Sequence, residues 1–273
     1  MNRGVLIFAF NNDKIDYLKQ ANWVADRVNR YMNTPVTIVT DEKSINGRSF
    51  EHNLVLTDAI SGGLRNFNHK TKDKVDQWYN VNRFQAYELS PYDETIVIDS
   101  DYVVSSDQLL NLFENPHDVL CHRDVYDVTG LGKFRWYKHF GRYEMPHYWA
   151  TVLFFRKGDF AKMFFDVMTM VKENYRHYGF IHKFSTGMYR NDFAVSIALS
   201  IVYGHNLNSI PTIPWNLPSL YDDVDVEELE HDKFMLRYAS RDSKGNAKLH
   251  RSLLQGSDFH CINKFTLEKL VNA

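Results

Sequence analysis

Short apolar runs alternate along this chain with longer stretches whose apolar residues recur at helical spacing. Residues 4–10 (GVLIFAF) predict a strand buried on both faces, and residues 17–32 predict an amphipathic helix. A second apolar run follows at 36–39. A strand, a helix and a strand of these lengths form a βαβ unit with a right-handed crossover, so the pattern predicts a parallel sheet.

The same alternation continues to the end of the chain. It predicts strands at 53–57, 95–98, 118–121 and 151–155, and helices at 75–89, 107–113, 160–175, 189–203 and 266–271. Four stretches are expected outside them: a basic mobile loop at 62–74, an extended segment at 210–216, an acidic solvated segment at 222–232 and a basic loop or hairpin at 241–251. Together they predict an α/β fold whose mixed, mostly parallel central sheet is flanked by helices.

Two carboxylates follow the predicted strand at 95–98. Asp99 and Asp101 are two residues apart, and side chains alternate along a strand, so both should point to the same side. Neighbouring carboxylates need a cation, an arginine or a shared proton, and oxygen ligands of this kind suit Mg²⁺ or Mn²⁺. Capping of the next element by Asp101 is the alternative. The place after a buried strand, where open α/β sheets bind ligands, favours a site.

The amino-acid composition agrees with this fold class. The 273 residues are 44% hydrophobic and 15% aromatic, and no linker-like stretch divides them, so we expect a single domain over 1–273. Cys121 and Cys261 have neither disulfide-framework nor metal-ligand spacing, which favours a reducing, cytoplasmic setting. The run 4–10 is too short to cross a bilayer, so no membrane insertion is expected.

Polar residues also follow the first two predicted strands. Nucleotides bind over the carboxyl ends of parallel strands, which makes these positions candidate contacts to a base or a ribose. Ordinary turn chemistry is the alternative at each of them. These polar candidates are Asn11, Thr40 and Asp41, and Ala9 and Phe10 at the end of the first strand are candidate contacts to the nucleotide sugar.

Charged residues elsewhere could complete a site built on the two aspartates. Arg83 could meet a diphosphate or neutralise an aspartate, although a solvated arginine fits the pattern equally well. His260 offers a ring nitrogen to a divalent cation, and Lys264 offers a point charge to a phosphate. A structural, hydrogen-bonded histidine is the alternative for His260.

The stretch 133–149 combines positive charges with aromatic rings. Positive charges neutralise phosphates and flat rings stack on bases or sugars, so the stretch is a candidate acceptor surface. An aromatic loop packed on the core, with its charges in water, explains it equally well. The candidate acceptor residues are Lys133, Arg135, Trp136, Tyr137, Lys138 and Arg142.

Taken together, these segments resemble the GT-A glycosyltransferases, most closely the family 8-like type that uses nucleoside-diphosphate sugars. The resemblance lies in the arginine ahead of LSPYDETIVIDSD, in WATVLFF, RNDFAVSIAL and IPWN, and in the closing HCINK. Two features depart from the family. Ile262 and Asn263 stand where the family has a glycine-containing turn between its closing His and Lys, and Asn191-Asp192 replaces its Asp-Gln pair.

The resemblance implies a GT-A fold and metal-dependent transfer of a sugar from a nucleoside-diphosphate sugar, with UDP the leading nucleotide, to an acceptor hydroxyl. Residues 1–104 would form the half that binds nucleotide sugar and metal, and residues 105–273 the acceptor half. The cation would be Mn²⁺ or Mg²⁺.

The resemblance also distributes roles among residues. Asp99, Asp101 and His260 would hold the metal. Asp101 and Asp192 would be the catalytic carboxylates; in a retaining reaction Asp192 only orients the substrate, whereas in an inverting one Asp192 or Asp127 must act as a base. The further contacts to the nucleotide sugar would be Arg83, Ser100 and Lys264.

The acceptor stays open between several classes. A compact transferase without an anchor also resembles bacteriophage sugar transferases, which implies a flipped-out hydroxymethylated cytosine of double-stranded DNA as acceptor, in the host cytoplasm. A glycan or a lipid-linked sugar is the alternative. A nucleotidyltransferase is disfavoured because FAFNND lacks a glycine-rich loop. A non-catalytic module that binds a nucleotide sugar or DNA is the third class, and the sequence predicts no oligomeric state.

Overall fold

A six-stranded mixed sheet forms the centre of the computed structural model, which describes residues 2–66 and 75–273. Its strand order is β3-β2-β1-β6-β12-β8. Neighbouring strands among β3, β2, β1 and β6 pair in parallel, and β12 runs antiparallel to both β6 and β8. The strands are β1 (Arg3–Phe8), β2 (Val36–Thr40), β3 (Asn53–Leu56), β6 (Glu94–Asp99), β8 (Val119–His122) and β12 (Trp149–Arg156).

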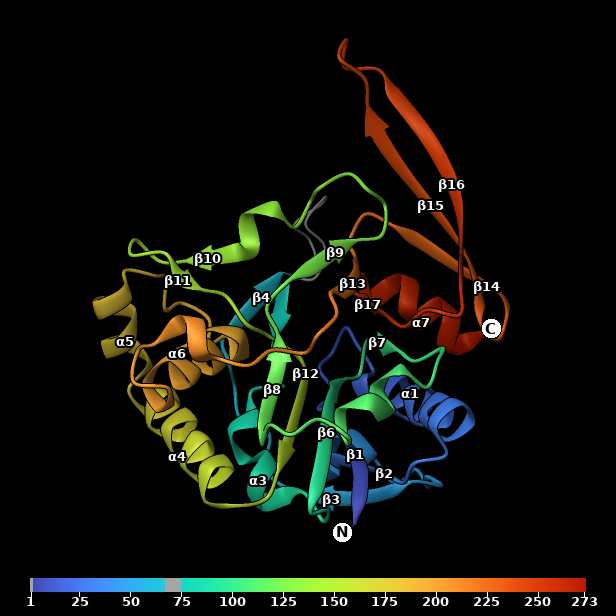
Figure 1. Ribbon diagram of the computed structural model, residues 1–273. Helices are drawn as coiled ribbons and strands as arrows, with labels where there is room; N and C mark the ends of the chain where they lie inside the picture. Colours follow the sequence, from blue (N-terminus) through green and yellow to red (C-terminus); the bar gives the residue numbers. More distant parts are fainter. Residues whose placement is uncertain (1, 67–74) are drawn as a thin grey trace.

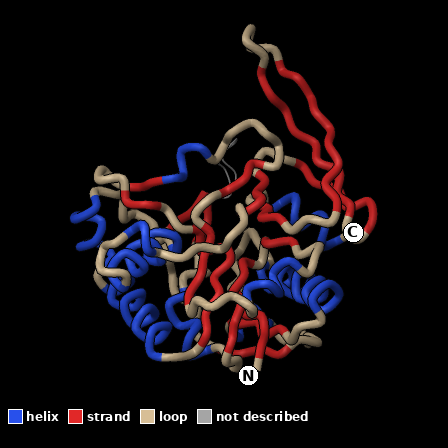
Figure 2. The backbone as a smooth tube through the Cα atoms, viewed as in Figure 1, coloured by secondary structure: helices blue, strands red, loops and turns tan. Residues whose placement is uncertain are grey.

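Helices lie outside this sheet, as Figure 2 shows, and the predicted mixed, mostly parallel sheet flanked by helices is confirmed. The apolar side of the first helix is buried as its periodicity predicts, and the central strand residues Ile96, Val97 and Ile98 have no exposed surface. No helix in the described ranges is long and apolar enough to cross a bilayer. The helices are α1 (Tyr17–Met32), α2 (Glu42–Ile45), α3 (Ala86–Leu89), α4 (Asp159–Glu173), α5 (Tyr175–His182), α6 (Asn191–Val202) and α7 (Lys264–Asn272).

A second, four-stranded sheet of order β7-β17-β13-β9 joins the end of the chain to the central strand β6. Its first pairing sets His260 opposite Tyr102, one residue after the second aspartate of the Asp-Ser-Asp triplet. The amide of Cys261 donates to the carbonyl of Asp101 at 2.9 Å. The strands are β7 (Tyr102–Val103), β9 (Val125–Asp127), β13 (Leu217–Leu220) and β17 (Phe259–Cys261).

Several hairpins extend from the two sheets. The acidic segment expected to be solvated forms the strand β14, and the basic segment at 241–251 belongs to a much longer hairpin than the sequence predicts. Figure 1 shows this hairpin, in orange and red, projecting away from the rest of the chain. The hairpin strands are β14 (Asp225–Glu230), β15 (Lys233–Arg241), β16 (Ala247–Gln255), β10 (His139–Phe140), β11 (Met145–Pro146), β4 (Leu64–Asn66) and β5 (Val75–Gln77).

The helix predicted at 75–89 is wrong over its first half. The chain there forms β5, then the 3-10 helix η1 (Asn82–Gln85), and only its end is α-helical. Two asparagines explain the difference, because Asn80 accepts from the amide of Phe10 at 3.0 Å and Asn82 donates to the carbonyl of Asp58 at 3.0 Å. The predicted loop at 62–74 contains β4, and its residues 67–74 lie outside the described ranges.

The ends of the other predicted strands and helices match the structure within two residues. The helix expected at 107–113 is the 3-10 helix η2 (Gln108–Leu112), and the stretch 133–149 contains the 3-10 helix η3 (Arg135–Lys138). A short 3-10 helix, η4 (Leu207–Ser209), leads into the extended segment at 210–216.

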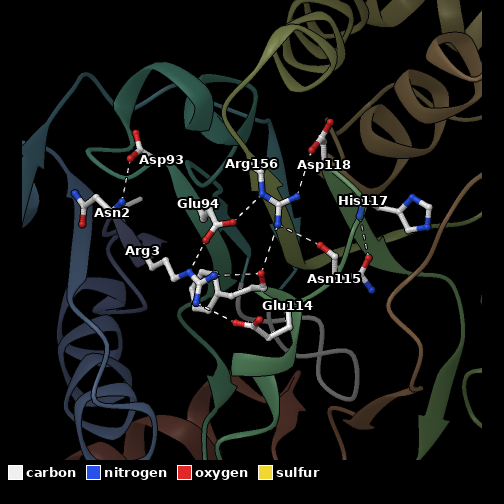
Figure 3. Close-up of polar contacts among 10 residues, drawn as sticks. Asn2, Arg3, Asp93, Glu94, Glu114, Asn115, His117, Asp118 and Arg156 are labelled. Atoms are coloured by element: carbon white, nitrogen blue, oxygen red, sulfur yellow. Dashed lines mark hydrogen bonds and ion pairs between the residues drawn. The ribbon is translucent and has the colours of Figure 1, made fainter.

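Ion pairs close the amino end of β6 (Figure 3). The Glu94 carboxylate is 2% exposed and pairs with the guanidinium groups of Arg3 and Arg156, the latter donating from Nε at 2.7 Å. Arg156 also donates to the carbonyl of Asn115 at 3.1 Å and to the Asp118 carboxylate at 3.3 Å. Burial by itself would raise the pKa of Glu94, but the two arginines lower it below its ordinary value.

Candidate active site

A cavity of about 340 Å³ lies at the opposite, carboxyl end of β6. The end of β1, the Asp-Ser-Asp triplet after β6 and the start of the antiparallel strand β12 line it from the central sheet. Residues of η1, of the start of α6 and of the β17–α7 connection complete its wall. The cavity therefore occupies the edge where parallel sheets bind their ligands.

Asp99, Asp101 and His260 form a cluster that could hold a metal ion at this cavity. One ligand atom of each lies within 4.8 Å of the others, and His260 Nε2 is 3.2 Å from Asp101 Oδ2. Burial lowers the pKa of His260 to about 4, so the imidazole is neutral at pH 7 and its lone pair is available. Two carboxylates and a neutral imidazole are a donor set that divalent cations accept, so these residues fit such an ion.

Two cationic side chains reach the same carboxylates. Lys264, the first residue of α7, contacts Asp101, and Arg83 on η1 donates from Nη2 to Asp99. Both cationic side chains are buried, and burial lowers the pKa of Lys264 to about 7. The buried Nη1 of Arg83 has no hydrogen-bond partner among the described residues, which leaves a charged donor at the cavity for an anion.

Asp192 lies in the first turn of α6 and also lines the cavity. Its Oδ1 accepts from the Ala150 amide at 2.9 Å, and its Oδ2 accepts from Arg190 at 3.2 Å. Burial would raise the pKa of Asp192, but the charges of Arg190 and His147 and the amide bond lower it to about 2. The carboxylate is therefore ionised at neutral pH and fixed between α6 and β12.

The residues predicted to contact a base or ribose lie outside this cavity's lining. The side-chain Oδ1 of Asn11 accepts from the Leu18 amide at 2.8 Å, which ties the loop to α1. The Thr40 hydroxyl donates to the carbonyl of Ala9 at 2.6 Å, and Phe10 is fully buried. Asp41 caps α2 through its side chain. Turn and packing contacts therefore account for all five positions, whereas Ser100 lines the cavity.

The candidate acceptor stretch reaches the cavity through Tyr137 and Trp149. The Lys133 ammonium pairs with Asp223, while the residues Arg135, Lys138 and Arg142 are exposed. Trp136 lies on η3, and its side chain lies outside the described part of the structure.

Asp127, the alternative base, is engaged in a turn. Its carboxylate accepts from the Thr129 amide at 3.0 Å and from the Lys133 amide at 2.9 Å. It does not belong to the cavity lining that the described residues form.

Aromatic side chains that the sequence did not single out make up much of the remaining wall. The buried hydroxyls of Tyr17 and Tyr189 line the cavity region without a hydrogen-bond partner among the described residues. These side chains come from segments far apart in the chain, so periodicity could not group them. Tyr137 and Trp149 are the exceptions, since both belong to the aromatic stretch at 133–149. The aromatic residues of the wall are Phe8, Tyr17, Trp78, Tyr137, Trp149, Tyr189 and Tyr221.

Several solved structures resemble the chain weakly. No protein-family model and no curated protein sequence matches the chain. Among solved structures, the glycosyltransferase GlyE of Streptococcus pneumoniae is similar at 11% identity and a TM-score of 0.43, over 78% of this chain and 45% of that one. The chain thus spans less than half of GlyE.

Two other solved structures show a similar degree of likeness. Mouse xyloside xylosyltransferase 1 has 11% identity and a TM-score of 0.42, over 75% of this chain and 83% of its own. The 4-diphosphocytidyl-2C-methyl-D-erythritol synthase of Anaerococcus prevotii has 9% identity and a TM-score of 0.36, over 77% of this chain and 86% of its own. Every one of these TM-scores is below 0.5.

Proposed function

We propose that this protein is a metal-dependent GT-A glycosyltransferase that moves a sugar from a nucleoside-diphosphate sugar to an acceptor hydroxyl. One observation carries the proposal: three groups that can ligate a divalent cation and two buried cationic side chains meet at one cavity. A diphosphate needs this combination, because it binds a metal ion and still carries negative charge for side chains to neutralise.

Several residues of the chain would bind the diphosphate of the donor. A divalent cation held by Asp99, Asp101 and His260 would supply charge neutralisation of the departing diphosphate. The spare Nη1 of Arg83 would donate to a phosphate oxygen. Lys264, which contacts Asp101, is within reach of the same place and would stabilise the developing charge. We propose Mn²⁺ as the ion and UDP as the nucleotide.

On the sugar side, Asp192 is the proposed catalytic carboxylate. Its low pKa keeps it ionised, and its bonds to Ala150 and Arg190 hold it still. An ionised carboxylate at this place would orient the sugar or stabilise positive charge at the anomeric carbon as the diphosphate leaves. In an inverting reaction it would also accept the proton of the acceptor hydroxyl.

We propose a hydroxymethylated cytosine of double-stranded DNA as the acceptor. Support comes from the exposed basic residues of the same stretch whose Tyr137 ring lines the cavity. Such residues would contact phosphates while a flipped base enters among the aromatic rings of the wall. A glycan or a lipid-linked sugar is the alternative acceptor.

The proposal is tested by incubating the protein with a panel of nucleotide sugars, with and without Mn²⁺, and measuring release of the nucleoside diphosphate. We expect Mn²⁺-dependent release from at least one donor, and mass spectrometry of candidate acceptors then identifies the product. A nucleotidyltransferase would instead release pyrophosphate from a nucleoside triphosphate. Binding of a nucleotide sugar without turnover under all these conditions would contradict the proposal.

A further inference from the structure

The hairpin of β15 and β16 forms an arm that no part of the proposed chemistry uses. The two strands pair in unbroken register from Lys233 opposite Gln255 to Arg241 opposite Ala247. Nine residues per strand give a ribbon of about 30 Å. β14 pairs with β15 only as far as Arg237, so the outer part is two-stranded. Figure 1 shows the arm rising on the side of the central sheet where the strands end.

The base of the arm is fixed to the core. Phe234 has no exposed surface and Leu236 is 1% exposed. The Phe234 and Phe259 rings meet edge-on, with their centroids 5.0 Å apart. Phe259 immediately precedes the histidine of the metal cluster. The arm is therefore anchored beside the candidate site, and its outer part extends from a rigid base.

The arm is much more basic than the chain as a whole. Residues 233–255 contain six lysines and arginines against one aspartate, a net charge of +5 in a chain whose formal net charge is -2. The one aspartate is hydrogen-bonded within the arm. The Asp242 carboxylate accepts from the amides of Lys244 and Asn246, each at 2.9 Å. The outer arm thus holds basic side chains with no free acidic group of its own.

One cross-strand pair of the arm places two arginines opposite each other. Arg237 and Arg251 stand opposite each other, and like charges in this arrangement destabilise a hairpin. Glu227 of β14 neutralises Arg237, but Arg251 has no ion-pair partner among the described residues. On the same face Leu249 is 84% exposed, so this side of the ribbon is open. A bound anion would give Arg251 the partner that Glu227 gives Arg237.

We propose that the arm binds double-stranded DNA through its phosphates and holds the polymer while the candidate site acts on it. The identity of the acceptor polymer rests on the proposed function; the binding itself does not. A two-stranded ribbon matches the width of the DNA major groove, and basic residues spaced along its length match a repeating line of phosphates. An anionic membrane fits less well, since Leu249 is the one large apolar side chain that the described outer arm exposes, and the arm carries no Trp or Phe beside it to insert at the interface.

The test compares two full-length variants of equal net charge. The arm variant neutralises exposed residues whose side chains have no hydrogen bond or ion pair among the described residues. Arg241 is kept because its side chain donates to the Gly245 carbonyl at 3.0 Å. The arm variant is Lys244→Gln, Lys248→Gln, Arg251→Gln. The control variant neutralises exposed residues on α1, α2 and α5: Arg30→Gln, Lys43→Gln, Arg176→Gln.

Binding to a fluorescein-labelled 20-base-pair duplex is measured by anisotropy from low to high salt. We expect the arm variant to bind at least about tenfold more weakly at low salt, with a salt slope smaller by about 3, while the control matches wild type. Equal thermal unfolding and equal acceptor-independent release of nucleoside diphosphate would show that fold and site are intact.

The remaining outcomes distinguish DNA binding by the arm from the proposed transferase function. Duplex binding that is equal in both variants would overturn the arm proposal, as would no binding by wild type while donor turnover proceeds. Loss of a dimer, or of binding to anionic vesicles, without a change in DNA binding would also overturn it. Arm-dependent DNA binding by a protein that turns over no donor would support the arm proposal and contradict the proposed transferase function.

Discussion

Strand β6 has a buried carboxylate close to each end, Glu94 at the amino end and Asp101 just past the carboxyl end, and their surroundings differ. Glu94 is held by two arginines that contact further carbonyl and carboxylate oxygens (Figure 3), and it does not line the candidate-site cavity. Asp101 meets one lysine and one neutral histidine at a cavity of about 340 Å³. Both ends concentrate charge, and the candidate-site cavity lies at the carboxyl end.

The difference shows which buried charges belong to stability and which to binding. At the amino end the partners are satisfied within the protein, so the network stabilises the fold and offers nothing to a ligand. At the carboxyl end a buried arginine nitrogen and two tyrosine hydroxyls lack partners among the described residues. Such groups cost stability unless something else satisfies them, which is typical of a site.

The largest expected effect follows from Asp101→Asn. Loss of this carboxylate removes a candidate metal ligand and the partner of Lys264, so we expect turnover to fall by about 100-fold or more. The measurement is initial-rate release of nucleoside diphosphate under saturating Mn²⁺. Glu94→Gln is the matched control, and a similar fall in its turnover per folded molecule would erase the distinction between the two ends.

Mn²⁺ should stabilise the protein through the carboxyl end alone. At a free concentration of about 100 times the dissociation constant, a bound ion adds about 2.7 kcal/mol to the free energy of unfolding. We expect thermal unfolding to shift upward by roughly 5 °C in wild type and in Glu94→Gln. Asp99→Asn should not show this shift. A full shift in Asp99→Asn would place the ion elsewhere.

Glu94→Gln should lower stability while leaving the site intact. The amide loses its charge-assisted bonds to Arg3 and Arg156, and we expect the free energy of unfolding to fall by about 2 kcal/mol. Denaturant unfolding at pH 7 measures the difference. An unchanged midpoint would mean that the amino-end network contributes nothing to the fold.

The smallest effect is the pH dependence of that network. The pKa of Glu94 is lower in the folded chain than its ordinary value of 4.5, so the unfolded chain binds the proton first. Its stabilising contribution is complete above pH 4.5 and is lost as the pH falls through the lower folded pKa. Unfolding measured from pH 7 down to pH 3 should therefore show a steeper loss in wild type than in Glu94→Gln. Parallel curves would contradict the assignment.

The sequence predicts the carboxyl end better than the rest of the cavity, for a physical reason. A short β-branched run followed by Asp99 and Asp101 carries its own geometry, because alternation puts both carboxylates on one side. His260 could be nominated from its chemistry, but its place depends on the pairing of β17 with β7, which no local pattern encodes. The cavity's tyrosines come from separate segments and carry no periodic signal.

The errors also have local causes. At 75–89 the apolar residues Trp78, Val81 and Phe84 mimic a helical stripe, yet two intervening asparagines bond to other segments and the chain turns instead. Around the arm, residues 222–232 look solvated because their acidic side chains are mostly exposed, although the backbone pairs as β14. Exposure of side chains does not exclude a strand when its other residues, such as Val226, are buried.

The central claim is that Asp99, Asp101 and a histidine from the end of the chain act together on a metal-bound diphosphate. Calorimetric titration of UDP into wild type and into His260→Ala, each with and without Mn²⁺, tests it most directly. We expect Mn²⁺ to tighten UDP binding at least about tenfold in wild type and to have little effect in His260→Ala. An equal effect of Mn²⁺ on UDP binding in both proteins would contradict the claim.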